Sequence, residues 1–170
     1  LVIERGKFAG AKNMFGGMVC GNVLAKLIPN FWEEAPIERY ITQQIITLLS
    51  REDSLSISFQ TPSFGEPPYN GYSILRAKFD KWLTQKVEEA GAIVVSGLLV
   101  EDLLWNDEKI VGVKAGGENF PANVVIAADG VNSLMAQKAG LAKEPRPEYV
   151  SLGVKELIKL PREVIQERFN

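Results

Sequence analysis

The 170-residue sequence contains no histidine and a single cysteine, Cys20. Without histidine, the segment lacks the most common general base, metal ligand and catalytic-triad partner. One cysteine cannot form an internal disulfide, and it falls short of the roughly four thiolates that hold an iron–sulfur cluster. We therefore interpret Cys20 as a small buried hydrophobic residue, expect no metal site, and identify no catalytic acid or base.

Long apolar runs and blocks of like charge are also missing. No apolar run reaches the roughly 18 to 20 residues of a membrane-spanning helix, and no signal-peptide pattern opens the chain. The 19 basic and 21 acidic residues are mixed along the sequence, which argues against nucleic-acid binding. With 46% hydrophobic and 24% charged residues, the composition is that of a globular protein. Because no signal peptide is visible, we expect a cytoplasmic location.

The sequence has no methionine at its start and no G-x-G-x-x-G motif anywhere. Its first residues, "LVIERG", read as the end of a buried strand followed by a turn at Gly6. A domain rarely begins inside its own core strand, so we interpret the chain as a segment of a longer protein. A Gly-rich loop, "FAGAKNMFGGMVCGN", is expected next, followed by a short helical turn that Pro29 stops.

Apolar periodicity predicts the remaining elements. Leu55, Ile57 and Phe59 alternate with serines, which predicts a half-buried strand in antiparallel structure over residues 37–60. Further predicted strands are 72–75, 92–97, a hairpin over 98–116, 122–128 and 149–160. Helices are predicted from Lys78 to a C-terminal glycine at Gly91, over 132–139, and over 161–169.

These elements predict an α/β (α+β) fold of two parts. Buried strands with crossover helices (1–5, 78–100 and 122–140) are typical of a three-layer, Rossmann-like dinucleotide-binding unit. We assign it residues 1–30 and 76–145 and expect it to be incomplete. An inserted antiparallel sheet, assigned residues 31–75 and 146–170, would form part of a substrate or acceptor domain.

Three charged side chains are candidates for ligand binding. Glu4 ends a predicted strand, where a dinucleotide-binding unit uses an acid to bind ribose hydroxyls; it could equally be a solvated strand end. Asp129 ends a predicted strand directly before a helix, where it could face a ligand or simply serve the helix N-terminus and the turn. Arg76, between a strand and a helix, is either an ordinary surface arginine or a contact to a phosphate or a flavin.

The stretches "LVIERG", "YSILRAKFDKWL" and "NVVIAADGVNS" occur in the order and spacing seen in FAD-binding oxidoreductases of the glutathione-reductase-like class. The last resembles the Asp-Gly motif of the hydroxylase and geranylgeranyl-reductase branch. With "AGAKNMFGGMVCG", "LIPNF" and "LPREVIQERF", the chain resembles FixC-type flavoproteins, relatives of electron-transfer-flavoprotein–quinone oxidoreductase. The resemblance covers essentially all 170 residues.

For the adenosine and pyrophosphate of FAD, this resemblance implies four contacts. Glu4 would hold the ribose, with Arg5 beside it, and the backbone of Val100 would meet the adenine. Arg76 would contact the cofactor near its pyrophosphate or ribityl chain. The Gly-rich pyrophosphate turn of the family is absent, so we expect the segment alone to bind FAD poorly and to be inactive.

For the flavin end, the resemblance implies that Asp129 binds the ribityl hydroxyls and that Gly130 allows a close backbone approach. Gly16 and Gly17 match a loop near the isoalloxazine. The implied activity is transfer of electrons from an electron-transfer flavoprotein toward quinone or another acceptor. A ferredoxin-like protein would be a second partner, and a quinone would require peripheral contact with a membrane.

Two alternatives stay open. A geranylgeranyl-reductase-like enzyme, which reduces isoprenoid double bonds, shares the same FAD scaffold. The other alternative is a flavin-free binding or scaffold domain.

Overall fold

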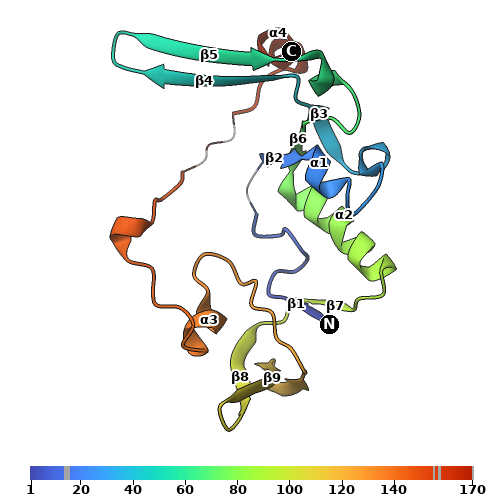
Figure 1. The fold of residues 1–170 in the computed structure, drawn as a ribbon, viewed down its shortest axis with the longest axis vertical. Coiled ribbons are helices and arrows are strands. Elements are labelled where there is room, and N and C mark those ends of the chain that lie inside the picture. The colour runs from blue at the N-terminus through green and yellow to red at the C-terminus, as the bar shows by residue number, and fades with distance from the viewer. Residues whose placement is uncertain (14–15, 155, 157, 170) are drawn as a thin grey trace. The chain divides into compact units, whose positions relative to one another are not determined.

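The computed structural model describes residues 1–13, 16–154, 156 and 158–169. Its contacts divide the chain into two compact units, Leu1–Val125 and Ile126–Asn170. The ten strands and the longest helix of the described residues belong to the first unit (Figure 1). None of the described helices has the length and apolar character that crossing a membrane requires.

A parallel strand pair opens the first unit. β1 (Val2–Glu4) pairs in parallel with β7 (Val94–Ser96), and the helix α2 (Arg76–Glu89) lies between them in the sequence. Parallel neighbours need such a crossover connection, and it is the building block of dinucleotide-binding folds. The predicted strands at both positions are confirmed, whereas the three-layer arrangement around them stays a prediction.

A second sheet of three antiparallel strands carries β2 (Gly16–Cys20), β6 (Gly71–Leu75) and β3 (Ile37–Tyr40), with β6 in the centre. The prediction of a loop was wrong for 16–20, because these residues pair with every residue of β6. Cys20 at the end of β2 is exposed, so the prediction that it is buried was also wrong. The sheet joins β2, which precedes residue 31, to strands that follow it, while the predicted domain boundaries themselves stay untested.

An aromatic core lies between β6 and α2. Phe31, in a short 3-10 helix η1 (Phe31–Glu33), and Tyr72 are fully buried, and their rings meet edge to face with centroids 5.0 Å apart. Phe79 and Trp82 of α2 cover them, as the helical periodicity predicted. Burying a large apolar side chain contributes about 1.5–3 kcal/mol, so this cluster anchors α2 on β6.

α2 itself begins at Arg76, two residues earlier than predicted. It ends at Glu89, and Gly91 follows with a φ of 91°, as expected for a glycine that closes a helix. The short helix α1 (Gly21–Leu24) follows β2 and packs against the same core.

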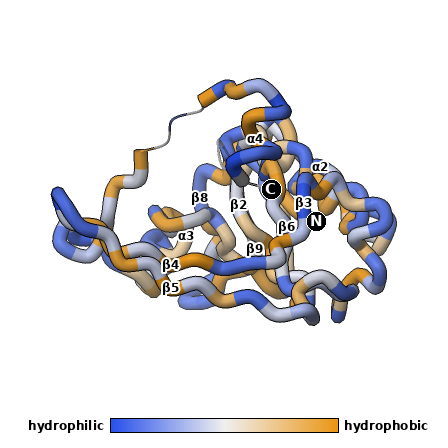
Figure 2. Tube along the Cα trace, turned by 90° about the horizontal axis from the view of Figure 1, so that it is seen from above, coloured by the Kyte–Doolittle hydropathy of each residue, from blue (hydrophilic) through white to orange (hydrophobic). Residues whose placement is uncertain are grey.

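The β4–β5 hairpin has one apolar and one mostly polar face. β4 (Gln43–Leu49) and β5 (Ser54–Gln60) pair along their whole length, and hydrophobic segments recur along both strands (Figure 2). The register places Ile46 opposite Ile57 and Leu48 opposite Leu55, and residues paired in this way share a face. These four side chains are 59–67% exposed. The strands are confirmed, but the prediction of a half-buried sheet was wrong, because no layer covers this face in the described part of the chain.

The remaining strands of the first unit form an antiparallel meander in the order β10–β9–β8. A turn at Asp107, whose φ is 53°, joins β8 (Val100–Asn106) to β9 (Lys109–Ala115) as predicted, and β10 (Glu118–Pro121) follows two glycines with positive φ. A 3-10 turn, η2 (Pro62–Gly65), follows β5.

The described residues of the second unit form three short elements: α3 (Leu134–Lys138), the 3-10 turn η3 (Pro147–Tyr149) and α4 (Arg162–Phe169). The strand predicted over 122–128 is not formed, and Val124 and Ile126 are 76% and 85% exposed. The described residues of the strand predicted over 149–160 do not form one either, and positions 155 and 157 lie outside the described residues. A strand needs a neighbour to satisfy its backbone groups, and these segments have none among the described residues.

We expect Tyr72→Phe to stabilise a full-length protein that contains this chain. The Tyr72 hydroxyl is buried, and it forms no hydrogen bond with any described residue. An unsatisfied buried polar group costs about 1–3 kcal/mol, so the free energy of unfolding should rise by about 1 kcal/mol in denaturant titrations. Tyr40→Phe, at a half-exposed ring, is the control and should change little. A clear loss of stability in Tyr72→Phe alone would contradict this account.

The same residue predicts an alkaline instability. Burial, with a smaller contribution from Tyr69, raises the pKa of Tyr72 from 10.0 to about 12. The folded state therefore holds this proton more tightly than the unfolded state. The free energy of unfolding keeps the full contribution of this bound proton below pH 10 and loses it as the pH rises toward 12. Tyr72→Phe should show a smaller fall of stability across this interval than the unmodified protein, and equal slopes would contradict the assignment.

Candidate functional site

Glu4 lies at the carboxyl end of the parallel pair, as the sequence predicted. One oxygen of its carboxylate, Oε1, accepts a hydrogen bond from the backbone N–H of Gly6, which turns the carboxylate over the start of the following loop. Carboxyl ends of parallel strands are where α/β folds bind their ligands. Arg5, next in the chain, is exposed.

The backbone that leads into Val100 lies beside this strand end. Leu98 N–H donates to the carbonyl of Glu4 at 3.1 Å, and Gly97 N–H donates to that of Gly6 at 2.7 Å. Val100 then begins β8 two residues later and is partly buried. The structure thus brings the segments of Glu4 and Val100 to one edge.

The loop after Glu4 runs against the first turn of α2. Gly10 has a φ of 87°, and a Cβ on it would lie 2.8 Å from Cβ of Asp80 and 3.0 Å from the carbonyl oxygen of Arg76. Only glycine fits there without displacing the helix. The loop that follows β1 therefore packs against the N-terminal part of α2 at Gly10.

Asp80 joins this loop to Arg76. Its Oδ1 accepts a hydrogen bond from Arg76 Nε at 2.7 Å, and its Oδ2 accepts one from Asn13 Nδ2 at 2.7 Å. The Asp80 side chain is 13% exposed and that of Arg76 is 43% exposed. The hydrogen bond to Asp80 raises the pKa of the Arg76 guanidinium, more than burial lowers it, so Arg76 stays charged.

Gly16 and Gly17 lie next to the same junction. They are paired with Leu75 and Ile74 of β6, and Arg76 follows Leu75 directly. The structure therefore brings five of the predicted positions to two places in the first unit: Glu4 and Val100 to one edge, and Gly16, Gly17 and Arg76 to the start of α2.

Asp129 and Gly130 belong to the second unit, and their contacts lie within it. Asp129 Oδ2 accepts a hydrogen bond from the N–H of Met135, in the first turn of α3, at 2.9 Å. Gly130 has a φ of 85°, and its carbonyl accepts hydrogen bonds from the N–H and Oγ of Ser133. Asp129 thus binds the N-terminal turn of α3, which is one of its two predicted roles. With five residues, α3 is shorter than predicted.

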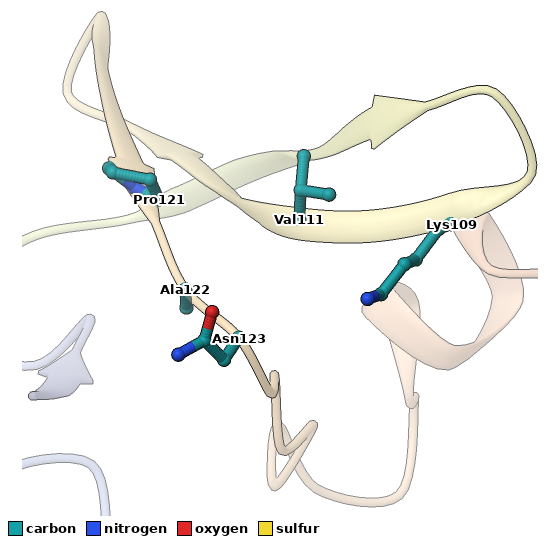
Figure 3. A pocket seen from close by; sticks show the side chains of 5 residues that line it. All are labelled: Lys109, Val111, Pro121, Ala122 and Asn123. Carbon is teal, nitrogen blue, oxygen red and sulfur yellow. The ribbon is translucent and has the colours of Figure 1, made fainter.

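A pocket lies elsewhere in the first unit, where β9 meets the end of β10 (Figure 3). Lys109 and Val111 extend from β9, and Pro121, Ala122 and Asn123 follow along the other wall. None of the predicted site residues lines it. Its lining offers a single charged group, and we assign it no ligand.

Sequence reasoning missed Asp80, Asn13 and Gly10. Asp80 stands four residues after Arg76, a spacing that brings two side chains together on a helix, so this pair was detectable from the sequence. Asn13 is 67 residues from Asp80, and no local pattern reveals such a contact. Gly10 was seen as part of a Gly-rich loop, but its partner was not.

Solved structures place this fold among known proteins. A geranylgeranyl bacteriochlorophyll reductase-like protein from Thermoplasma acidophilum matches 83% of the chain with a TM-score of 0.67 and 25% identity, over 35% of its own chain. The myxobacterial chondrochloren halogenase, described as a variant of FAD-dependent halogenases, matches 69% of the chain with a TM-score of 0.51 and 20% identity, over 28% of its own chain. The chain is therefore a mixed α/β segment with the fold of part of these reductases and halogenases.

Curated relatives of the chain are FixC proteins. FixC of Escherichia coli O157:H7 is 46% identical over 169 residues, and FixC of Azorhizobium caulinodans is 42% identical over 173 residues. The matches cover 99% and 100% of this chain and 40% of each relative. The chain is a homologue of the FixC proteins and spans about 40% of their length, which confirms the resemblance seen in the sequence. No family model matches the chain.

Replacing Gly10 should cost more than replacing another glycine of the same backbone conformation. Gly91 has a φ of 91° with no atom within 4 Å of an added Cβ, whereas Gly10 meets Asp80 and Arg76. Both alanine variants bear the left-handed strain of roughly 1–2 kcal/mol, and Gly10→Ala should lose about 1–3 kcal/mol more because of overpacking. Denaturant unfolding of the two full-length variants measures this difference, and equal losses would show that the loop does not press on α2.

Proposed function

We propose that this chain forms part of the FAD-binding region of an FAD-dependent oxidoreductase and acts within a longer protein such as its FixC relatives. The observation that carries the proposal is the connection between Glu4, at the end of the parallel pair, and Arg76, at the start of α2, through one tightly held loop. A dinucleotide requires an acid for its ribose hydroxyls and a cation for its phosphate oxygens, and this loop links one residue of each type.

The start of α2 fits the anionic part of the cofactor. Its first turn contains no acidic residue, and no side chain caps it. The first N–H groups of a helix have no partner within the helix, and the helix dipole favours an anion there. The N-terminal turn of α2 and Arg76 thus offer donors and positive charge together.

Each predicted residue receives a role in this proposal. Glu4 binds the ribose, with Arg5 beside it, the backbone of Val100 meets the adenine, and Arg76 binds the pyrophosphate. The flavin end is held by four further residues, of which Asp129 and Gly130 contact the ribityl chain, and Gly16 and Gly17 approach the isoalloxazine. FAD, when bound, supplies the electron transfer, while these residues bind and orient it.

As electron donor and acceptor we propose an electron-transfer flavoprotein and a quinone, with a ferredoxin-like protein as a further partner and contact with a membrane surface. The similarity to FixC over the whole chain supports this choice. The absence of histidine agrees with it, because the flavin itself carries the chemistry.

A geranylgeranyl-reductase-like activity on isoprenoid double bonds is the second candidate, which the likeness to the reductase-like protein of Thermoplasma acidophilum favours. Reduced full-length protein should be mixed with a quinone and, separately, with a prenyl lipid. Oxidation of the flavin by the quinone alone supports electron transfer, and oxidation by the lipid alone supports the reductase. Full-length protein that releases no flavin on denaturation and is not stabilised by FAD would support a scaffold domain instead.

Replacing Arg76 should weaken FAD binding. A hydrogen bond to a charged group contributes about 1.5–3 kcal/mol, so Arg76→Ala should raise the Kd for FAD of the full-length apoprotein roughly 10- to 100-fold, measured by flavin fluorescence titration. Glu4→Gln, which removes the charge at the ribose, should weaken binding less. Lys81→Ala, an exposed cation on the same helix, is the control. An unchanged Kd in Arg76→Ala would overturn the assignment of this residue.

A further inference from the structure

Asp80 is the described carboxylate that touches both the loop after β1 and Arg76. Its two oxygens are divided between two segments: Oδ1 accepts from Arg76 Nε, and Oδ2 accepts from Asn13 Nδ2. At 13% exposure the Asp80 side chain is nearly buried. A carboxylate in that position acts on its partners more than on solvent, because the low local dielectric strengthens both contacts.

The contact through Nε determines how the guanidinium is presented. Arginine has five N–H donors in one rigid plane. Asp80 engages Nε, the donor nearest the backbone, and no hydrogen bond with a described residue engages the terminal nitrogens, so these stay available to a ligand. A free arginine loses rotamer entropy when it is ordered, and the bond to Asp80 restricts the side chain before any ligand arrives.

We infer that Asp80 is a positioning residue, which aims the terminal nitrogens of Arg76 at an anionic diphosphate and couples them to the loop that follows Glu4. The inference rests on the proposed function, because the diphosphate is that of FAD. Asp80 does not touch the cofactor, so its effect on binding passes through Arg76.

Whether removal of Asp80 weakens or tightens the binding of FAD distinguishes an orienting role from a purely electrostatic one. A carboxylate near a phosphate repels it and partly neutralises the arginine. If charge alone mattered, removal of Asp80 would tighten the binding of FAD. If orientation dominates, as the Nε contact indicates, removal of Asp80 weakens it.

A double-mutant cycle in the full-length protein tests the inference. Apoproteins of Asp80→Ala, Arg76→Ala and the double variant are titrated with FAD, and Glu88→Ala, an exposed acid on α2, is the matched control. Because residues in contact show coupled effects, Asp80→Ala should raise the Kd about tenfold when Arg76 is present and less than about twofold when it is absent. If Asp80→Ala does not fold, Asp80→Asn, which keeps the shape but not the charge, replaces it in the cycle.

The outcomes separate the two proposals. Equal losses in both backgrounds, with a parallel fall in the apoprotein Tm, would mean that Asp80 only supports the fold. Tighter binding in Asp80→Ala would mean that its charge opposes the cofactor. Either result overturns the positioning role of Asp80 but does not contradict the proposal that the protein binds FAD. If Arg76→Ala leaves the Kd for FAD unchanged, Arg76 does not bind the cofactor, and the inference about Asp80 is overturned as well.

Discussion

The hydrogen bonds of Asp80 are the constraint on which the arrangement of the candidate site depends. They hold Arg76 and Asn13 together, although these residues are separated by more than 60 positions in the sequence. Gly10 completes the contact, because its missing Cβ lets the loop approach the first turn of α2. Isolated surface ion pairs contribute little, but the Asp80 carboxylate is only 13% exposed and is shared with a third group, Asn13.

The aromatic core makes this constraint effective. Phe79 and Trp82 fix α2 against β6 through Phe31 and Tyr72, so the first turn of the helix has a defined position when the loop meets it. β6 also pairs with Gly16 and Gly17. One strand and one helix therefore hold Gly16, Gly17 and Arg76, which the proposed cofactor would contact.

Local signals in the sequence predicted the elements that are stabilised locally. The periodic placement of Phe79 and Trp82 predicted α2, and the turn residues predicted the β4–β5 and β8–β9 hairpins. The strand expected at Val124 failed for a different reason, because a strand depends on a neighbour that lies elsewhere in a chain. The same dependence left the apolar face of the β4–β5 hairpin exposed.

The candidate site shows the same division. Glu4 and Arg76 were recognisable because a charged residue at the end of a strand or the start of a helix is a local pattern. Asp80 could have been found from its i, i+4 spacing to Arg76. Its contact with Asn13 could not, because it arises only from the folded path of the loop.

The crystal structure of a full-length, FAD-loaded protein containing this chain tests the central claim most directly. The account predicts that terminal nitrogens of Arg76 lie about 2.7–2.9 Å from pyrophosphate oxygens of the cofactor, while Nε of Arg76 remains hydrogen-bonded to Asp80. A cofactor whose phosphates lie away from Arg76, or an Arg76 that leaves Asp80 to reach them, would contradict it.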